Sequence, residues 1–351
     1  MESTTAALDS SPDYSLNSTY TKSNTSSVTE SGSGLNVVDA VVIVMQILMA
    51  VVIIGGNVLT ILAVKRTPRL HTVPNMYVVS LAVADLIVGI VLPFYAIKMF
   101  PGMENLYNQN KYLCLSHPVL LIVSAGCSIV SMVVISVDRL IYIVRPLRYE
   151  YIATARRARI IIGTTWCGCI FYGTLPLYYN TFDGVKPCEL FNILHMEYQL
   201  YGQVTIFCVC CVVAGASYGY IFKISYHQRK AMLDVTRQSI DTDTRAVVST
   251  FKREWPMIKM FVLVFGVFFV CWCPAIVGIV LGNTVGIEPT TMNLLVLSCL
   301  LNSGMNFIIY GVKNQDFRRA YCLLLCSKRI SYYERTDTEN KSASGNELMY
   351  T

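Results

Sequence analysis

Charged residues are scarce in this sequence of 351 residues: Asp, Glu, Lys and Arg together make up 14%, whereas hydrophobic residues make up 54%. Soluble globular domains carry about 25% charged residues, so an ordinary soluble domain is excluded. The sequence has only 4 histidines, in separate loops or at separate ends of its apolar stretches, and they cannot build one catalytic or metal site. This distribution argues against an enzyme. No internal repeat is visible, which disfavours transporters built from inverted repeats.

The sequence contains several long runs of apolar residues. A helix needs roughly 20 apolar residues to cross a hydrocarbon core of about 30 Å. The sequence predicts seven such spans, at about 37–64, 75–98, 112–144, 159–179, 198–225, 256–281 and 291–312. We therefore expect an all-α membrane protein, a seven-transmembrane helix bundle followed by a short amphipathic eighth helix.

Basic residues set the expected orientation, because cytoplasmic loops retain Lys and Arg. These residues crowd the links after spans one, three and five and the segment after span seven, whereas the N-terminal tail carries Lys22 alone among several acids. We expect an extracellular N-terminus in the plasma membrane. The tail lacks the apolar stretch of a cleaved signal peptide, so span one is expected to direct insertion. The net charge of +6 then reflects topology and contact with anionic lipids, with no nucleic-acid partner.

Ionisable side chains inside the spans are few, and each costs roughly 3 kcal/mol on insertion scales. Asp85 lies near the middle of span two. The polar residues expected at compatible depth are Asn57, Ser128, Asn302, Ser303 and Asn306. Oxygen ligands of this kind suit a hard cation or a water cluster. One alternative is a protonated Asp85 bonded to Asn57, and another is an ion pathway of a channel or transporter, for which a single acid is little support.

A second pair of charges, Asp138 and Arg139, ends span three, and Glu254 lies just before span six at the same membrane face. Ion pairs of Arg139 with both acids would hold spans three and six together. The alternative is an interfacial pair worth less than about 1 kcal/mol. Pro274, in FFVCWCPAIVG, removes one backbone hydrogen bond and predicts a kink beside Trp272. A latch and a hinge together favour a two-state element.

Most of the 13 cysteines lie inside the spans, as small apolar packing residues. Cys114 opens span three and Cys188 lies in the fourth link, both on the oxidising side, so a disulfide between them is expected. Cys322 and Cys326 follow span seven in an amphipathic stretch, where we expect palmitoylation or, alternatively, simple burial against lipid. Asn17 and Asn24 begin glycosylation sequons.

At about 37–327 the chain resembles the rhodopsin-like, class A G-protein-coupled receptors. The motifs that carry the resemblance are GGNVL at Asn57, SLAVADL at Asp85, Cys114 with Cys188, Asp138-Arg139-Leu140, Trp166 with Pro176, Tyr218, CWCP at 271–274, NFIIY at 306–310, and Phe317. The resemblance implies four parts: an extracellular, glycosylated, disordered tail at 1–36, the receptor domain at 37–312, an amphipathic helix at 313–327 and a disordered cytoplasmic tail at 328–351.

The function implied by the resemblance is ligand-driven nucleotide exchange on a heterotrimeric G protein, followed by contact with receptor kinases and arrestin. In this family the arginine matching Arg139 is held by acids at rest and released when span six swings out. The residues implied in coupling and switching are Asp138, Arg139, Leu147, Tyr218, Glu254, Asn306 and Tyr310. The residues that resemble the family's sodium site are Asp85, Ser128, Asn302, Ser303 and Asn306. No cofactor besides an allosteric sodium ion is implied.

The ligand pocket implied by the resemblance is nearly all apolar. Its residues are Tyr95, Leu121, Ile122, Ala125, Trp272, Ile276, Ile279, Val296 and Leu300. Such walls favour a lipid or another hydrophobic small molecule. The alternatives are a peptide held by the extracellular loops and a receptor that signals without any ligand.

Three ligand classes of the family are disfavoured. Leu121 stands where amine receptors carry an aspartate, and span seven has no lysine for retinal. Adenosine receptors carry an asparagine at the position of Ile279 and an aromatic residue at that of Leu190.

The sequence also departs from the family pattern within the helices. Leu140 replaces the usual tyrosine, which is a common change. Phe307 replaces a proline, which predicts a less distorted span seven, and Cys210 replaces the proline of span five, which predicts the loss of the bulge there.

Overall fold

All seven predicted spans form helices. The computed structural model describes residues 37–235 and 242–326, apart from the side chains of 38, 225, 227–235, 242–257, 289, 290 and 293. In this part of the chain, seven stretches are long and apolar enough to cross a membrane: Asp39–Arg66, Val73–Lys98, Lys111–Val144, Ala155–Leu177, Tyr198–Ile224, Ile258–Thr284 and Leu294–Lys313. Their ends lie within a few residues of the predicted ones, because the length of each apolar run defines its span.

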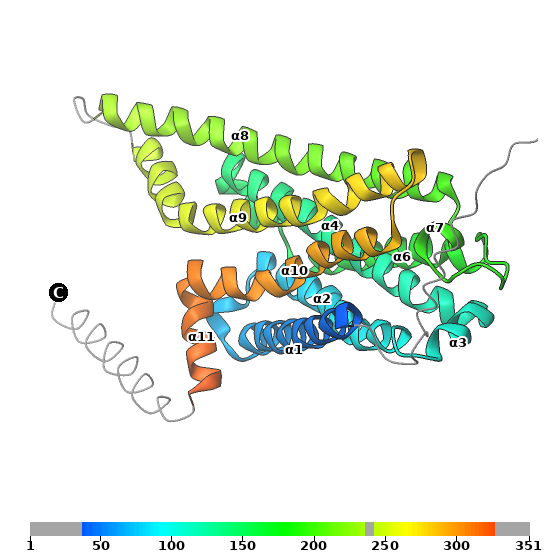
Figure 1. Ribbon diagram of the computed structural model, residues 1–351. Helices are drawn as coiled ribbons and strands as arrows, with labels where there is room; N and C mark the ends of the chain where they lie inside the picture. Colours follow the sequence, from blue (N-terminus) through cyan, green and yellow to red (C-terminus); the bar gives the residue numbers. More distant parts are fainter. Residues whose placement is uncertain (1–36, 236–241, 327–351) are drawn as a thin grey trace, which may run out of the picture. The chain divides into compact units, whose positions relative to one another are not determined.

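The spans are built from α1 (Val37–Arg66), α2 (Val73–Lys98), α4 (Lys111–Val144), α6 (Ala155–Thr174) with η3 (Leu175–Leu177), η4 (Tyr198–Val204) with α8 (Thr205–Val235), α9 (Thr242–Thr284) and α10 (Pro289–Lys313). The shorter elements are η1 (Pro68–Leu70), α3 (Met103–Gln109), η2 (Pro146–Arg148), α5 (Tyr149–Ile152), α7 (Leu190–Ile193) and α11 (Gln315–Leu325). In Figure 1, α11 turns away from α10 beside the end of α1, and it contacts both helices.

Helix α4 defines two ends of the bundle. Cys114 lies in its first turns and Arg139 near its last turn, which at 1.5 Å per residue separates the two by about 37 Å along the axis. We refer to these as the disulfide end and the Arg139 end. The side chain of Asn110 accepts a hydrogen bond from the Leu113 amide and begins the helix, as an N-cap residue does.

Polar side chains tie neighbouring spans together inside the apolar bundle. Trp166 of α6 donates to the hydroxyl of Ser80 on α2 at 3.0 Å. Ser298 of α10 donates to the carbonyl of Cys271 on α9 at 2.8 Å, one turn before Pro274. Interhelical hydrogen bonds of this kind help associate helices in lipid, where apolar burial offers little driving force.

The aromatic ring of Phe307 packs directly on the backbone of Gly56, between α10 and α1. A Cβ added at Gly56 would lie 2.0 Å from Cδ1 of Phe307, so only glycine leaves room for this ring. Helix α10 continues through Phe307 without interruption, in agreement with the predicted absence of a proline distortion.

Cys210, which stands in place of proline, lies within the regular α-helix α8, in agreement with the predicted loss of the bulge there. The sequence analysis did not predict that η4, at the start of the same span, is a π-helical segment. Its turns are wider than those of an α-helix. Tyr198 of η4 and Tyr172 of α6 stack with ring centroids 4.9 Å apart, and Gln199 donates to the carbonyl of Leu194 at 2.9 Å. The π-helical turns of η4 therefore lie where Tyr172 and Tyr198 pack together.

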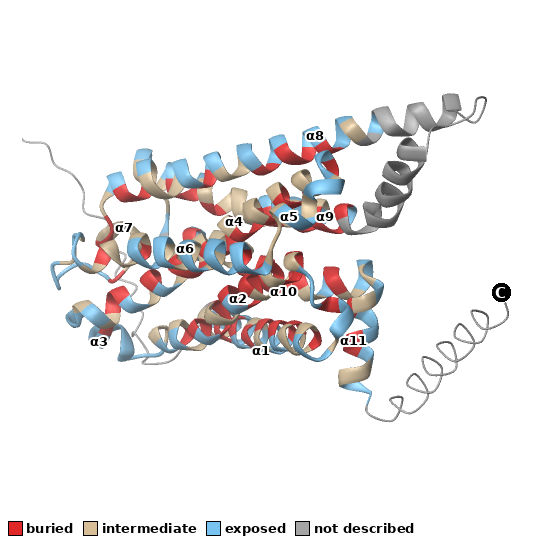
Figure 2. Ribbon diagram, turned by 180° about the vertical axis from the view of Figure 1, so that it is seen from behind, coloured by how far each residue is buried: buried red, intermediate tan, exposed pale blue. Residues whose placement is uncertain are grey.

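The outward faces of α6 and α8 are largely exposed, as Figure 2 shows. Phe171 of α6 is 72% exposed and Val212 of α8 is 70% exposed. Exposed apolar faces on helices of spanning length mark contact with lipid.

Candidate functional site

The disulfide holds the link after α6 over one end of the bundle. Cys114 and Cys188 are bonded, with their Cα atoms 5.8 Å apart, which confirms the predicted pair. The backbone amide of Cys188 donates to the side chain of Asn108 at 2.7 Å, and Lys98 donates to its carbonyl. These bonds place the short helix α7, including Phe191, beside a cavity.

This cavity has a volume of about 550 Å³, within the range typical of small-molecule sites. All nine residues of the predicted ligand pocket line it: Tyr95, Leu121, Ile122, Ala125, Trp272, Ile276, Ile279, Val296 and Leu300. The walls come from α2, α4, α6, α9 and α10, from the η4–α8 span and from the link that carries Cys188. The structure thus brings the predicted pocket residues together.

The cavity also has a polar corner that the sequence analysis did not assign to the pocket. The rings of Tyr95 and His117 stack with centroids 4.2 Å apart. Lys98 and Glu189 line the same cavity, and among its described lining residues they are the one ammonium and the one carboxylate. A signal for this corner exists in the spacing, since Tyr95 and Lys98 lie one helical turn apart on α2.

The floor of the cavity is aromatic. Trp272 and Phe268 stack one turn apart on α9 with ring centroids 5.8 Å apart, and Phe207 of α8 lies 6.2 Å from Phe268. Ile129 of α4 lines the cavity beside them. A molecule in the cavity would therefore contact the segment of α9 that holds Pro274.

Beyond the floor, all residues of the predicted Asp85 cluster are buried, and one of them is hydrogen-bonded to Asp85. Asn306 donates to one carboxylate oxygen of Asp85 at 2.8 Å. Within this cluster, four buried oxygens have no hydrogen-bond partner among the described residues: Asp85 Oδ1, Ser128 Oγ, Asn302 Oδ1 and Asn306 Oδ1. Leaving such a group unsatisfied costs about 1–3 kcal/mol. Four bare oxygens fit a hard cation or a cluster of waters.

Asn57 forms no hydrogen bond with Asp85, which contradicts the alternative of a direct bond between them. Its amide instead donates to the carbonyls of Ile53 at 2.9 Å and Ser303 at 3.1 Å. Asn57 thereby joins α1 to α10 beside the cluster.

At the opposite end of α4, Arg139 is held by Asp138. Two guanidinium nitrogens donate to the same carboxylate oxygen, at 2.6 and 3.1 Å, and the two residues are only 2% and 7% exposed. The side chain of Glu254, the second predicted acid, lies outside the described residues. The predicted ion pair between Arg139 and Asp138 is present.

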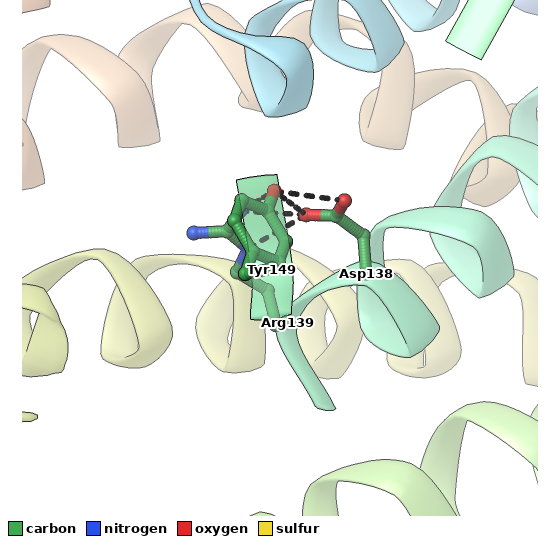
Figure 3. A network of polar contacts seen from close by, with 3 residues as sticks. All are labelled: Asp138, Arg139 and Tyr149. Atoms are coloured by element: carbon green, nitrogen blue, oxygen red, sulfur yellow. Dashed lines mark hydrogen bonds and ion pairs between the residues drawn. The ribbon is translucent and has the colours of Figure 1, made fainter. Parts of the chain in front are cut away.

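Tyr149 completes this group and was missed by the sequence analysis. Its hydroxyl donates to the two oxygens of Asp138 at 3.0 and 3.1 Å, and accepts from Arg139 at 3.0 Å. Figure 3 shows the three side chains converging. Burial raises the pKa of the Tyr149 hydroxyl, with a smaller opposing effect from Arg139, so the hydroxyl keeps its proton and donates.

The other predicted switch residues are divided between the interior and the surface. Tyr218 is buried with its ring 5.7 Å from that of Phe265, and Tyr310 is buried 5.3 Å from the ring of Phe317. Leu147, in η2 at the Arg139 end, is 87% exposed and available to a partner.

The predicted modification sites lie at the margins of the described chain. Cys322 and Cys326 are both exposed, on α11 and just after it. Asn17 and Asn24, like the predicted tails 1–36 and 328–351 as a whole, lie outside the described residues.

Comparison with known proteins agrees with this geometry. A sequence profile described as "7 transmembrane receptor (rhodopsin family)" matches residues 56–310. Adenosine receptor A3 of Ovis aries is 29% identical over 293 residues, covering 81% of this chain and 89% of its own length. Adenosine receptor A2b of Mus musculus is 29% identical, with 88% and 95% covered. A D(1)-like dopamine receptor of Oreochromis mossambicus is 28% identical, with 82% and 80% covered.

The family match extends over most of the chain and includes five whole spans, most of span seven and the last part of span one. The chain therefore belongs to the rhodopsin family of seven-transmembrane receptors: it is a multi-pass protein of the plasma membrane that signals through G proteins, and it is not an enzyme.

Proposed function

We propose that a small molecule bound against Trp272 drives a two-state change that frees Arg139 for a G protein. A ligand shifts such an equilibrium only by its difference in affinity for the two states. The cavity floor supplies this difference, because Trp272 and Phe268 belong to α9, the helix that carries Pro274. In the active state α9 swings away from α4 at the Arg139 end and leaves a cleft for the G protein.

The observation that carries this proposal is the burial of Arg139. A permanently charged guanidinium is costly to bury, and it is retained here between Asp138 and Tyr149. A purely structural role would be served as well by apolar packing, which often replaces a buried ion pair without loss of stability. A releasable cation beside the exposed Leu147 is what binding of a G-protein helix would require.

We propose a mainly apolar small molecule with one polar group as the ligand. Its body would lie among Leu121, Ile122 and Ile276, and its polar group would reach His117 and Glu189. Adenosine and amines are the competing ligand classes, because the similar proteins include receptors named for adenosine and for dopamine. Leu121 provides no carboxylate for an ammonium, and Ile279 provides no amide for a purine. A peptide, or signalling without any ligand, would leave the cavity itself unused.

Sodium is proposed as an allosteric ion at Asp85. The oxygens of Ser128, Asn302 and Asn306 that lack partners support this assignment, as does the negative charge of the aspartate. A bound cation would favour the resting arrangement by linking α2, α4 and α10. The site would otherwise hold water.

We also propose the orientation and the remaining partners. The disulfide end would face the outside, with glycans on Asn17 and Asn24, and the Arg139 end would face the cytoplasm. Palmitoyl groups on Cys322 and Cys326 would anchor α11 to the inner leaflet. Receptor kinases acting on the C-terminal tail would create the binding site for arrestin.

The first experiment measures nucleotide exchange without agonist on a panel of G proteins, in membranes that carry the wild type, Arg139→Ala or Leu147→Ala. Both substitutions are expected to abolish exchange on the subtype that the wild type activates. Tyr178→Ala is the matched control, because Tyr178 is 86% exposed, like Leu147 at 87%, but lies at the disulfide end. Unchanged exchange in the Arg139 and Leu147 variants, at equal surface expression, would refute the proposed switch.

A further inference from the structure

Near the disulfide end, α6 and η4 are joined by a pair of tyrosines. Tyr198 donates to the carbonyl of Tyr172 at 3.1 Å, Tyr172 donates to the carbonyl of Tyr198 at 3.5 Å, and their rings stack. A Cβ at Gly202 would lie 2.2 Å from the Tyr172 hydroxyl, so the side chain of Tyr172 packs directly on the backbone of η4. The two spans are therefore closed against each other near the disulfide end.

Farther from the disulfide end, the same cavity extends between these two spans. Its lining there includes Thr164, Thr165, Gly168 and Cys169 of α6, Gly126 and Val130 of α4, and Gln203 and Ile206 of the η4–α8 span. Thr164, Gly168 and Ile206 are exposed as well as cavity-lining. Residues with both properties mark the place where a cavity reaches the surface of the bundle. We refer to this part of the cavity as the lateral branch.

The lateral branch opens at the depth of the hydrocarbon core. Gly168 lies near the middle of the span Ala155–Leu177, well away from either end. The adjacent surfaces of α6 and α8 are apolar, with Phe171 and Val209 exposed. The surroundings of the opening are therefore acyl chains and not water.

The walls of the lateral branch suit a hydrocarbon chain. The hydroxyl of Thr164 donates to the carbonyls of Ile160 and Ile161 of its own helix, both at 3.0 Å. Its methyl group is therefore the part left to contact a chain in the branch. Gly168 has no atom within 4 Å of an added Cβ, so space is open beside it. Gln203 is the one amide among the described residues that line the branch.

We infer that the lateral branch receives the hydrocarbon chain of an amphipathic lipid ligand, which enters the pocket from the bilayer between α6 and α8. The inference rests on the proposed ligand-driven function and narrows it to a class of ligand. Continuity of the branch with the cavity at Ile122 and Trp272 distinguishes this ligand from a lipid that merely coats the bundle. The polar group of the ligand would stay with Gln203 or the corner at His117.

The test uses the full chain reconstituted in phosphatidylcholine vesicles, with palmitate that carries a terminal diazirine as the probe. After illumination, mass spectrometry locates the crosslinks. Crosslinks at Ile122 and Trp272 report the interior of the cavity, and crosslinks at Phe171 report lipid on the outer face. Gly168→Phe fills the open space in the branch. Gly163→Phe is the control, because Gly163 lies on the same helix, also has open space around its Cβ, and does not line the cavity.

In the wild type and in Gly163→Phe, we expect crosslinks at both the interior and the outer positions. In Gly168→Phe, interior labelling relative to Phe171 should fall about tenfold, and the smaller Gly168→Leu should give a partial loss. Interior labelling that persists in Gly168→Phe would overturn lateral entry. Labelling confined to Phe171 in the wild type would reduce the branch to a groove for bulk lipid, and would overturn the inference as well.

Nucleotide exchange measured on the same preparations separates this inference from the proposed function. Exchange that is retained in the wild type and lost in Arg139→Ala, together with no interior labelling, would leave the receptor switch intact and remove only the lipid ligand. Interior labelling that depends on Gly168, with no effect of Arg139→Ala, would support the lateral branch and contradict the switch.

Discussion

The hydroxyl of Tyr149 lies 3.0 and 3.1 Å from the two carboxylate oxygens of Asp138. Tyr149 begins α5, in the link between α4 and α6, so a single side chain fastens that link to the charged pair at the end of α4. The same hydroxyl accepts a hydrogen bond from Arg139, so Tyr149 helps to hold the guanidinium in place.

Tyr149→Phe is expected to raise agonist-independent nucleotide exchange. The substitution removes the hydroxyl and keeps the ring, and a hydrogen bond to a charged group contributes about 1.5–3 kcal/mol. The ratio of released to held Arg139 should then rise about tenfold or more, since 1.4 kcal/mol corresponds to a factor of ten. The measurement is basal exchange at matched receptor density.

The control for this prediction is Tyr142→Phe. The Tyr142 ring also faces Arg139, with the guanidinium carbon 5.3 Å from the ring centroid, but that contact needs no hydroxyl. Its basal exchange should match the wild type. Equal increases in both variants would show that Tyr149 acts by general loosening and not through its bonds to Asp138.

Gly56→Ala is expected to destabilise the bundle by about 1–3 kcal/mol, the usual cost of overpacking. The new methyl group would lie 2.0 Å from Phe307, so α1 and α10 would have to separate. Gly55→Ala offers a matched control, because no atom lies within 4 Å of its Cβ and alanine favours the helix. Thermal unfolding in detergent should show a lower Tm only for Gly56→Ala.

Adding Phe307→Ala to Gly56→Ala should restore part of the lost stability, since the ring that clashes is gone. Additive losses in the double variant would contradict the packing described for this pair.

The spans, the disulfide and the pocket could be predicted from the sequence because each follows from local rules or from position within a motif. Apolar length defines a span, and the spacing from Cys114 and Trp272 identifies pocket positions such as Leu121 and Ile276. All nine predicted lining residues face one cavity for that reason.

The remaining features depend on tertiary contacts that no local pattern records. Tyr149 stands in a polar link, and only the folded backbone brings its hydroxyl to Asp138. The π-helical segment η4 was not predicted, because no local sequence pattern records the packing of Tyr172 against Tyr198 beside it. Glycine is required at position 56 because Phe307, which lies far away in the sequence, packs on its backbone.

Sodium is expected to lower basal exchange relative to potassium at equal ionic strength. A sodium ion bound by Asp85 and the bare oxygens of Ser128 and Asn302 would stabilise the resting bundle. Asp85→Asn removes the negative charge, so exchange should become the same in both salts. Glu104→Gln, which alters an exposed carboxylate on α3, should keep the sodium effect. An effect of sodium that survives Asp85→Asn would place the ion elsewhere.

Adenosine and dopamine are expected to leave exchange at its basal level, even at saturating concentration. An ammonium needs a carboxylate close by, and among the described lining residues the cavity offers only Glu189, which shares its corner with the ammonium of Lys98. Leu121 and Ile279, which line the cavity, are apolar and leave the polar edges of a purine without partners, at a cost of about 1–3 kcal/mol for each buried group. The A3 receptor of Ovis aries, assayed beside this chain with adenosine, controls for the assay. Saturable activation by either compound, lost in Glu189→Gln and retained in Gly168→Phe, would assign the polar corner to a water-borne ligand and rule out the lipid.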